Sequence, residues 1–575
     1  MRTRAILVTC VTCASAWSGV GCNAVLGIDT KELASEDAAP DVPVEDASAD
    51  AGSDASTMPG AAASTPDASS SADAGPSFAL TVATATARVV RGHSVSVTVG
   101  VDRRGGLADA IYVAVNGLPS GVTVAAITIP SSQTTGTLVI QATATAALGG
   151  AQLSIAASGA VLRQSSTLGL VVQDASGTPD VTFATGGRLL LPFGVGGQNA
   201  APGGLAILKD GSLLFCGNAQ TSNTQVSEVT LARVTPAGAL DTTFGDGGVS
   251  LGVSAGSTAD VCFAMVVLPS GAAALGGFST PVPGGAHTFL MARFTSKGAP
   301  DSTFGSAGFV TTPFGSTDAK GYSLLAQPDG NPIVGGFGGN GTAFVRYLAN
   351  GTLDPNFGAL ANGTLVTMLP NAGVVWWMGS QSSGKLVAAV AFSTFLVLRY
   401  APAGVLDTSF GTSGHTAIDV GGQGSSNSSV VLVQPDDAIV AVGTAKSAGG
   451  SNDTAIARLT TDGQLDTTFA TAGWSLAHFD AGDSSTSAAA FQGDGAVVVA
   501  GQTPTTAGAA FSVLRFGANG AIDTTFGSAG RKTFEVGGLA QAIAVDDLGR
   551  IVVAGRLTAG LGGRDSSVVI YRLWP

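Results

Sequence analysis

The amino-acid sequence predicts an all-β fold in which one four-stranded unit repeats along the C-terminal two-thirds of the chain. A phrase typified by GAIDTTFGSAG at residues 520–530 occurs in seven full or degraded copies, and such self-similarity means that each copy folds as the same unit. Between the copies, short apolar runs flank Asp-Gly or Ser-Gly turns, which is the pattern of β-hairpins. No stretch offers about twelve residues of helical periodicity without a glycine or a turn cluster.

An aspartate marks each copy of the motif and sets the period. Successive aspartates are 61, 60, 53, 53, 59 and 57 residues apart by subtraction, at positions Asp180, Asp241, Asp301, Asp354, Asp407, Asp466 and Asp523. Four short antiparallel strands at this period describe a propeller blade. Because a lone four-stranded sheet cannot bury both of its faces, neighbouring units must stack. The sequence therefore predicts a closed seven-bladed β-propeller over residues 178–575.

An arginine ends the last strand-like run of each repeat and indicates how the ring closes. Six of these arginines lie eight residues before a repeat aspartate, whereas Arg572 has no aspartate after it and Asp180 has no arginine before it. A closed ring pairs these two, and a set of functional carboxylates is the alternative. We expect seven structural ion pairs: Arg233–Asp241, Arg293–Asp301, Arg346–Asp354, Arg399–Asp407, Arg458–Asp466, Arg515–Asp523 and Arg572–Asp180.

Each motif also carries a phenylalanine, which we interpret as a wedge between blades because it buries a large apolar area. These residues are Phe183, Phe244, Phe304, Phe357, Phe410, Phe469 and Phe526.

The repeated motif resembles the bacterial delta-60 repeat family, whose units carry G-x-L-D-x-x-F-G. The resemblance covers about residues 178–575 and implies a surface or secreted β-propeller without an assigned reaction. Two positions depart at the leucine, Pro179 and Pro300, and two at the glycine, Ala184 and Ala470. These departures weaken individual turns rather than the assignment.

Composition excludes one class of partner. The chain has 575 residues, 82 of them glycine, and its 26 basic and 39 acidic side chains give a formal net charge of −13. Nucleic-acid binding needs clustered Lys and Arg to neutralise phosphates, so no nucleic-acid partner is expected.

Residues 1–22 read as a secretory signal peptide that resembles a bacterial lipoprotein signal. Arg2 and Arg4 precede the apolar stretch Ala5–Trp17, and the small residues before Cys22 are typical of a cleavage site. The lipobox leucine is replaced by Gly19, and an ordinary signal peptide with a chance cysteine is the alternative. In the lipoprotein interpretation, acyl chains on Cys22 hold the protein at a membrane. Since Asn23 follows rather than aspartate, this class of protein implies the outer membrane or the cell surface.

Two further segments precede the repeats. Residues 23–77 are rich in Ala, Ser, Asp and Pro, cannot bury enough apolar area to fold, and are expected to form a disordered acidic tether. Residues 78–174 contain about seven alternating runs separated by turns, which predicts an immunoglobulin-like β-sandwich. Its sequence resembles that of modules common in bacterial surface proteins. A spacer is the plain interpretation of this sandwich, and a ligand-binding module is the alternative.

Short matches to catalytic motifs are expected by chance in a chain rich in glycine and serine, and none here has the structural setting that its motif needs. Ser254 lies in a G-x-S-x-G sequence, and residues 336–341 match G-x-G-x-x-G, but neither is expected to precede the helix that these motifs need. Ser382 and Lys385 form a chance S-x-x-K in a turn. The remaining candidates are turn aspartates and scattered histidines without metal-ligand spacing: Asp436, Asp437, Asp546, Asp547, His93, His287, His415 and His478. We therefore predict no catalytic residue, no cofactor and no metal.

Three features are left open. Cys216 and Cys262 fall in strands of adjacent repeats and could form a disulfide or be simply buried. Residues 374–378 (VVWWM) form one aromatic cluster, interpreted as a core strand with a sugar-stacking platform as the alternative. Non-repeating Gly/Ser/Pro loops could rim one face, where function concentrates on a constant scaffold.

The sequence thus favours a membrane-anchored, monomeric surface lipoprotein that binds or adheres to a protein or glycan without catalysis. The alternatives are an extracytoplasmic hydrolase or lyase acting on polysaccharide in the propeller funnel, and a purely structural cell-envelope protein. An enzyme would need acidic or histidine side chains that converge on one face. The ligand and the functional face are not predicted.

Overall fold

The computed structural model describes residues 75–191, 201–220, 226–315, 317–359, 362–368, 373–391, 394–421, 426–478, 482–506, 508–557 and 567–575. All elements in this part of the chain are β-strands, so the all-β prediction is confirmed. Within the same residues, no helix is long and apolar enough to cross a bilayer. The predicted signal peptide, the lipidation site Cys22 and nearly all of the predicted tether lie outside the described residues.

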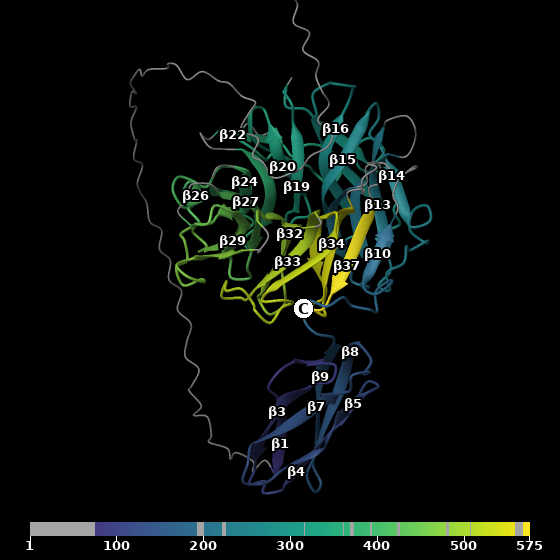
Figure 1. Cartoon of the computed structure of the whole chain (residues 1–575), viewed down its shortest axis with the longest axis vertical. Coiled ribbons are helices and arrows are strands. Elements are labelled where there is room, and N and C mark those ends of the chain that lie inside the picture. The colour runs from purple at the N-terminus through teal and green to yellow at the C-terminus, as the bar shows by residue number, and fades with distance from the viewer. Residues whose placement is uncertain are drawn as a thin grey trace, which may run out of the picture. The chain divides into compact units, whose positions relative to one another are not determined.

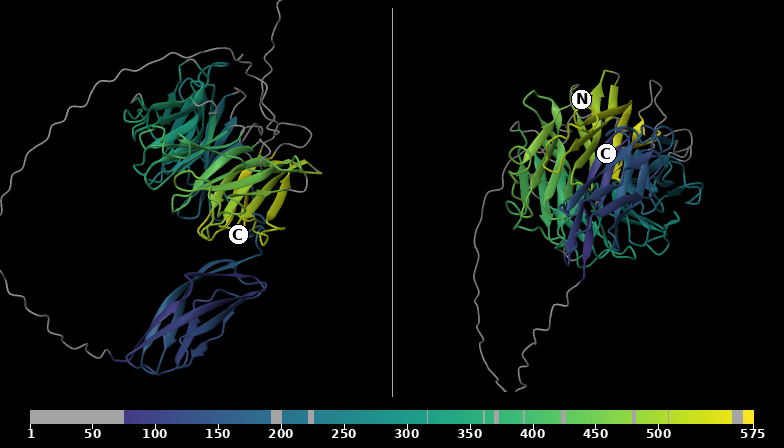
Figure 2. Two further views of the ribbon diagram at one scale, coloured as in Figure 1. Left: turned by 90° about the vertical axis from the view of Figure 1, so that its left-hand side faces the viewer. Right: turned by 90° about the horizontal axis from the view of Figure 1, so that it is seen from below.

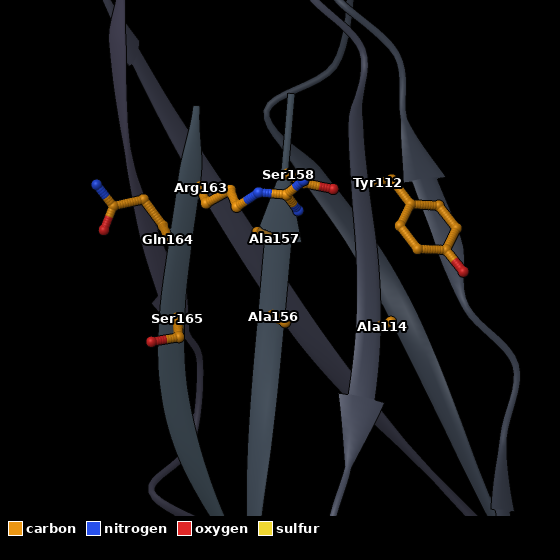
Figure 3. A pocket seen from close by; sticks show the side chains of 8 residues that line it. All are labelled: Tyr112, Ala114, Ala156, Ala157, Ser158, Arg163, Gln164 and Ser165. Carbon is orange, nitrogen blue, oxygen red and sulfur yellow. The ribbon is translucent and has the colours of Figure 1, made fainter. Parts of the chain in front are cut away.

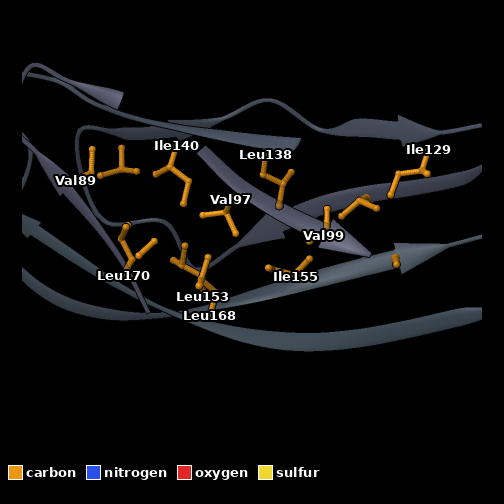
Figure 4. Close-up of a cluster of buried hydrophobic side chains, with 14 of the residues drawn as sticks. Val89, Val97, Val99, Ile129, Leu138, Ile140, Leu153, Ile155, Leu168 and Leu170 are labelled. Atoms are coloured by element: carbon orange, nitrogen blue, oxygen red, sulfur yellow. The ribbon is translucent and has the colours of Figure 1, made fainter. Parts of the chain in front are cut away.

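The first folded part contains two sheets that face each other. One sheet has the order β1-β3-β7-β5 and the other β2-β9-β8-β4-β6. Buried side chains of both sheets, such as Val97 and Leu138 from one and Leu153 and Leu168 from the other, form one apolar core (Figure 4). The nine strands are β1 (Ser77–Val82), β2 (Thr86–Val90), β3 (Ser94–Arg104), β4 (Ile111–Asn116), β5 (Val122–Val124), β6 (Ile127–Ile129), β7 (Thr135–Ala142), β8 (Gly149–Ser158) and β9 (Arg163–Gln173).

Two of the predicted strands in this part are each divided in two. Hydrophobic alternation over residues 80–90 and over residues 122–127 predicts one strand in each run. The first run instead covers the end of β1 and all of β2, and the second covers β5 and the first residue of β6. In both cases the chain crosses from one sheet to the other between the two strands. Hydrophobic alternation continues across the crossing, so the sequence pattern alone does not reveal it.

From Arg188 onward the strands fall into groups of four with antiparallel neighbours. The orders are β11-β12-β13-β14, β15-β16-β17-β18, β19-β20-β21-β22, β23-β24-β25-β26, β27-β28-β29-β30, β31-β32-β33-β34 and β35-β36-β37-β10. A single parallel bridge, Ser227 to Ala259, links the first two groups into one eight-stranded sheet. Figures 1 and 2 show these small sheets from three sides.

The bounds of these strands are β10 (Arg188–Leu191), β11 (Ala201–Ile207), β12 (Leu213–Gln220), β13 (Ser227–Val234), β14 (Val249–Gly252), β15 (Ala259–Val267), β16 (Ala273–Thr280), β17 (Thr288–Phe294), β18 (Phe309–Thr312), β19 (Lys320–Ala326), β20 (Pro332–Gly338), β21 (Gly341–Arg346), β22 (Thr364–Thr367), β23 (Val374–Ser380), β24 (Leu386–Ala391), β25 (Phe395–Tyr400), β26 (His415–Ile418), β27 (Ser426–Val433), β28 (Ile439–Lys446), β29 (Asn452–Leu459), β30 (Trp474–Ala477), β31 (Ser485–Phe491), β32 (Val497–Thr505), β33 (Gly508–Phe516), β34 (Arg531–Val536), β35 (Gly538–Val545), β36 (Ile551–Leu557) and β37 (Val568–Leu573).

The first strands of the groups form a closed circuit. β11 contacts β15, and the contacts continue through β19, β23, β27, β31 and β35, which contacts β11 again. Apolar clusters lie between neighbouring groups; one joins Val552 and Ile570 of the last group to Leu213 and Phe215 of the first. This arrangement of curled sheets is that of a β-propeller, with the first strands innermost.

The last group is completed by the start of the repeat region. β10 pairs with β37, with Arg188 opposite Tyr571 and Leu191 opposite Val568; Figure 1 shows the two strands side by side. Because the apolar run 187–193 directly follows a repeat motif, the sequence predicts that it begins the unit formed with the next hairpin. The structure instead pairs its described part, β10, with β37 of the last group. The sequence unit and the sheet are therefore out of phase by one strand, which ties the two ends of the ring together.

The motif phenylalanines lie between groups, as expected of wedges. All seven are buried, and the guanidinium of the neighbouring arginine lies 4.7 Å from the ring centre in four motifs, those of Phe183, Phe304, Phe410 and Phe469. Gly463 of the following repeat has a φ of +83°, and a Cβ there would lie 2.6 Å from the Phe410 ring.

Substitution of Gly463 by alanine is expected to lower stability for two reasons, a left-handed backbone and a displaced ring. Gly450 provides the matched control, because its φ is +86° and nothing lies within 4 Å of an added Cβ. We expect Gly450→Ala to cost about 1 kcal/mol and Gly463→Ala at least about 1 kcal/mol more. Urea unfolding of the two variants measures the difference, and equal losses would contradict the wedge interpretation.

Candidate functional site

The tight turns and the repeat motifs lie at one end of the propeller strands, and the remaining connections lie at the other end. Each first strand runs into the tight turn to the second, such as residues 208–212, and each third strand runs into the repeat motif, such as residues 235–248. These features share one end, which we call the motif end. The connections from second to third strand and from fourth to first strand lie at the other end, which we call the loop end.

At the motif end, the structure brings together all seven predicted ion-pair partners. The distances from arginine nitrogen to aspartate Oδ2 are 3.3 Å for Arg233–Asp241, 2.7 Å for Arg293–Asp301, 2.7 Å for Arg346–Asp354, 2.9 Å for Arg399–Asp407, 2.7 Å for Arg458–Asp466 and 2.8 Å for Arg572–Asp180, and Arg515 also contacts Asp523. Several arginines reach onward to the next repeat. Arg572, for example, donates to the carbonyl of Pro236 at 2.8 Å.

The other carboxylate oxygen of each motif is also occupied. Asp301 Oδ1 accepts from the Thr303 amide at 3.0 Å and from its hydroxyl at 2.6 Å. The same pair of bonds forms in five other motifs, with Thr182, Thr243, Ser409, Thr468 and Thr525 as donors. In the seventh motif Asn356 replaces the hydroxyl residue, and only its amide donates to Asp354 Oδ1, at 2.9 Å. The hydroxyl two residues after the other six aspartates is visible in the sequence, but its role as a turn cap was not predicted. These carboxylates are therefore bonded within the scaffold.

The turn caps give stability a pH dependence. The hydroxyl of Thr303 holds the pKa of Asp301 below its usual range, and Thr468 does the same for Asp466. Because the pKa is lower in the folded than in the unfolded state, this stabilisation is present above the unfolded pKa of about 4 and is lost as the pH falls through the folded pKa.

We expect the free energy of unfolding to fall as the pH is lowered from about 5 to 3, and the slope to be shallower in Thr303→Val/Thr468→Val. Valine keeps the shape of threonine but removes the hydroxyl bond to the aspartate. Urea unfolding at a series of pH values measures both slopes. A variant slope equal to that of the parent would show that the caps do not set these pKa values.

The two strand cysteines left open by the sequence form a disulfide. Cys216 in β12 and Cys262 in β15 are bonded with a Cα–Cα distance of 6.2 Å, across 46 residues of chain, and so link two neighbouring groups. Closing a loop of that length lowers the entropy of the unfolded chain by an amount worth roughly 4 kcal/mol.

We expect Cys216→Ala/Cys262→Ala to lower the free energy of unfolding by about 2–4 kcal/mol. Urea unfolding under non-reducing conditions measures this loss. Because both side chains are buried, reduced parent protein is the control that separates loss of the cross-link from loss of sulfur packing. Equal stability of oxidised and reduced parent would contradict the expectation.

Two of the serines in the catalytic motif matches bond to aspartates of the scaffold, and the glycine-rich match lies in a hairpin. Ser254 is buried, and its hydroxyl donates to Asp260 Oδ1 at 3.0 Å. The residues 336–341 join β20 to β21, with no helix between them. Ser382 bonds to Asp437, the hydroxyl at 2.5 Å and the amide at 2.6 Å.

Two histidines pair with carboxylates that the sequence reasoning did not connect to them. His287 Nδ1 lies 2.5 Å from Asp318 Oδ1, and His478 Nδ1 lies 2.7 Å from Asp453 Oδ1, both at the loop end. Among the described residues, no group of three or more His, Cys, Asp or Glu could hold a metal ion.

A recurring β-bulge distinguishes the first strands. In each of them one residue near the loop end has no partner in the second strand, and a bulge of this kind re-aims a side chain at a sheet edge. The bulged residues are Gly203, Phe263, Tyr322, Trp376, Ser429, Ser487 and Gln541. Because the first strands form a circuit, these residues stand at one level around it.

Three consecutive bulges carry aromatic side chains, which we call the aromatic arc: Phe263, Tyr322 and Trp376. The ring centres of Phe263 and Tyr322 are 5.0 Å apart, and those of Tyr322 and Trp376 are 4.7 Å apart. All three rings are partly buried, and burial raises the pKa of Tyr322 to about 12. The arc therefore spans three neighbouring sheets.

The aromatic cluster at 374–378 is divided by this bulge. Val375 and Met378 are buried in the apolar cluster shared with the preceding group, whereas Trp377 packs against the clusters of the following groups. Trp376 instead joins the aromatic arc. The core-strand interpretation thus describes most of the cluster but not Trp376. Phe263 and Tyr322 are isolated aromatic residues in the sequence, and their equivalence to Trp376 emerges only once the bulges align the strands.

The polar side chains beside the arc contact one another. Asp318 contacts both His287 and Lys320, whose Nζ lies 3.5 Å from Asp318 Oδ2 and 5.3 Å from the centre of the Phe278 ring. Phe278 in turn lies 5.8 Å from Phe263 and 4.8 Å from the His287 ring. The charges of Lys320 and Asp318 therefore offset one another locally.

A hollow of about 440 Å³ lies on the sheet containing β4, β8 and β9 (Figure 3). Small side chains such as Ala114 and Ala156 line it together with the half-exposed ring of Tyr112 and with Arg163. The lining residues are Tyr112, Ala114, Ala156, Ala157, Ser158, Arg163, Gln164 and Ser165. This hollow is the alternative location for a ligand.

Comparison with known proteins agrees with the propeller. A family model described as a domain of unknown function (DUF5122) beta-propeller matches residues 208–244, 327–357, 381–410, 434–469 and 492–526. Each matched stretch runs from the turn after a first strand to the phenylalanine of the next motif. The chain therefore carries β-propeller repeats, whereas membership of the delta-60 family stays a prediction.

Two solved structures are similar at low levels. A quinonprotein alcohol dehydrogenase-like protein from Bacteroides thetaiotaomicron VPI-5482 is 9% identical, with a TM-score of 0.26, over 66% of this chain and 92% of its own. Domains 4–9 of the surface layer protein SbsC are 9% identical, with a TM-score of 0.14, over 80% of this chain and 82% of their own. Neither TM-score is high enough to carry an argument about this chain. No curated protein matches it.

Proposed function

We propose that this chain is a surface-displayed binding or adhesion protein, held at a membrane through lipidated Cys22, whose propeller binds a ligand at its loop end without catalysing a reaction. The proposal includes an acidic tether, an immunoglobulin-like sandwich and seven four-stranded blades. The observation that carries the proposal is that all seven motif ion pairs are bonded within the scaffold. The charged groups of the motif end are therefore used for structure, and ligand binding is assigned to the loop end.

The sequence of the loop end supports this division of roles. The motif end repeats the same residues around the ring, whereas the loop-end connections differ in length and composition. Variable loops on a constant scaffold are where binding residues concentrate. Exposed apolar residues stand there, among them Val282 and Met368.

The rival, an enzyme acting on polysaccharide, would need two carboxyl groups converging on one scissile bond. Two of the loop-end carboxylates, Asp318 and Asp453, are each bonded to a histidine. No observation in the described residues favours the rival over binding. Turnover of any glycan that the chain binds distinguishes the two.

The test compares matched substitutions at the two ends of the ring, using the full chain on arrays of glycans and proteins. Val282→Asp and Met368→Asp place a charge at the loop end, and Val405→Asp does so at an equally exposed site of the motif end. Binding that is lost in the first two variants and kept in the third supports the proposal. Loss in Val405→Asp alone would contradict it.

The anchor is tested separately by labelling cells with radioactive palmitate. The parent chain is expected to take up the label and Cys22→Ala to lose it. Label retained in Cys22→Ala would contradict the lipoprotein interpretation.

A further inference from the structure

The bulge level is the place where the inner strands of an otherwise repetitive ring differ in chemical kind. Three neighbouring positions are aromatic, and the others are glycine, serine or glutamine. A purely structural role would be served by the same small residue in every repeat, as it is by Gly203. The aromatic residues also form one contiguous arc, with ring centres 5.0 and 4.7 Å apart. The asymmetry therefore points to recognition at one side of the ring.

The charge beside the aromatic arc indicates an uncharged ligand there. None of the bulged residues is charged, and Lys320 contacts Asp318. An acidic or a basic ligand on the arc would need an unpaired opposite charge beside it. In the last group, Arg556 lies opposite Leu539 beside the Gln541 bulge, and its Nε is buried without a hydrogen-bond partner among the described residues, so it offers a further N–H donor to a ligand oxygen.

The polar groups at the same level suit a ligand rich in hydroxyl groups. Ser487 supplies a hydroxyl, and Gln541 an amide whose Oε1 is buried without a hydrogen-bond partner among the residues that the structure describes. A buried acceptor left unpaired costs about 1–3 kcal/mol, which a hydroxyl donor from a ligand would offset.

Among uncharged ligands, a sugar ring combines both requirements. Its C–H groups carry partial positive charge and suit the negative face of an aromatic ring, while its hydroxyl groups donate and accept hydrogen bonds. We propose that the aromatic arc stacks the rings of a neutral glycan and that Ser487 and Gln541 bond its hydroxyl groups. This assignment rests on the proposed function, since it names the ligand class bound at the loop end.

The test is calorimetric titration of the full chain with neutral hexasaccharides of glucose and N-acetylglucosamine (cellohexaose, maltohexaose and chitohexaose) and with the anionic hexagalacturonate. We expect at least one neutral hexasaccharide to bind, and Trp376→Ala or Tyr322→Ala to weaken its binding by about tenfold or more. Trp376→Phe, which keeps a ring, should weaken it far less. Binding of hexagalacturonate alone would overturn the proposal.

Two controls show whether lost binding comes from the aromatic arc, from another site or from misfolding. Tyr112→Ala removes the exposed ring of the sandwich hollow and should leave binding unchanged; if it alone abolishes binding, the glycan site lies in the sandwich and the arc proposal is wrong. Melting temperatures show whether each variant folds, and if Trp376→Ala does not, then Tyr322→Leu, which keeps apolar volume but no ring, must still weaken binding.

Failure of this inference differs from failure of the proposed function. If no neutral hexasaccharide binds but an arrayed protein binds and Val282→Asp or Met368→Asp abolishes that binding, the arc proposal is wrong and the binding function stands. If nothing binds at the loop end, both are wrong.

Discussion

Deletion of residues 567–575 is expected to abolish cooperative folding of the propeller. The deleted segment contains β37, which pairs with β36 on one side and with β10 on the other. It also carries Ile570, Leu573 and Trp574, all of which are fully or almost fully buried. Burying such side chains contributes about 1.5–3 kcal/mol each, so the loss approaches the whole stability of a typical domain, about 5–15 kcal/mol.

Urea unfolding followed by circular dichroism measures the cooperativity, and amide hydrogen exchange of residues 188–191 reports whether β10 has lost its partner. Deletion of Pro575 alone is the matched control and should leave both unchanged. A synthetic peptide of residues 567–575 added to the truncated chain should restore protection of β10. A truncated chain that unfolds like the parent would mean that the ring does not depend on its last strand.

Substitution of Asp180 by alanine is expected to destabilise the protein by about 3–5 kcal/mol, because it leaves buried cations without an opposite charge. Asp180 is fully buried and accepts from Arg572 at 2.8 Å and from Arg550 at 3.0 Å. Arg572 is itself 4% exposed and bridges to Pro236 of the next repeat. Removing the carboxylate leaves both guanidinium groups without that partner at the point where the first and the last residues of the repeat region meet.

Asp241→Ala is the matched control, since Asp241 makes the same turn bonds to Thr243 but is 16% exposed and lies 3.3 Å from its arginine. An ion pair of that kind contributes about 0–1 kcal/mol. Urea unfolding of both variants measures how much more free energy of unfolding is lost at the ion pair that closes the ring than at an ion pair within one repeat. Equal losses would show that Asp180 has no special role in closure.

Much of the fold follows from local chemistry that is visible in the sequence. The repeat motif gives the unit, its aspartate and arginine lie eight residues apart, and the unmatched Arg572 and Asp180 indicate a ring whose ends meet. These residues interact within one short turn or across one closure, so spacing alone relates them. The second cation on Asp180, Arg550, lies in a turn of the last group, and no spacing rule connects it to position 180.

The placement of β10 and the alignment of the bulged residues depend on which strands pair and in which register, and neither can be seen in the sequence. Whether the run at 187–193 belongs to the group before or after it is decided by the hydrogen bonds of β37. The aromatic arc joins Phe263, Tyr322 and Trp376, which stand at no fixed spacing because the loops between them differ in length. Their common feature is a bulge, which one unpaired residue creates and which leaves no mark on the hydrophobic pattern.

The central claim is that the chain closes on itself through β10 and β37, and cysteine cross-linking tests it most directly. Leu189 and Ile570 face each other in this pair, so cysteines at the two positions of the full chain, in a Cys216→Ala/Cys262→Ala background, are close enough to bond. Mild oxidation should give an intramolecular disulfide in nearly all molecules, whereas cysteines at 189 and 545, in strands that are not paired, should stay reduced. Free thiols or only intermolecular products from the 189/570 pair would contradict a closed ring.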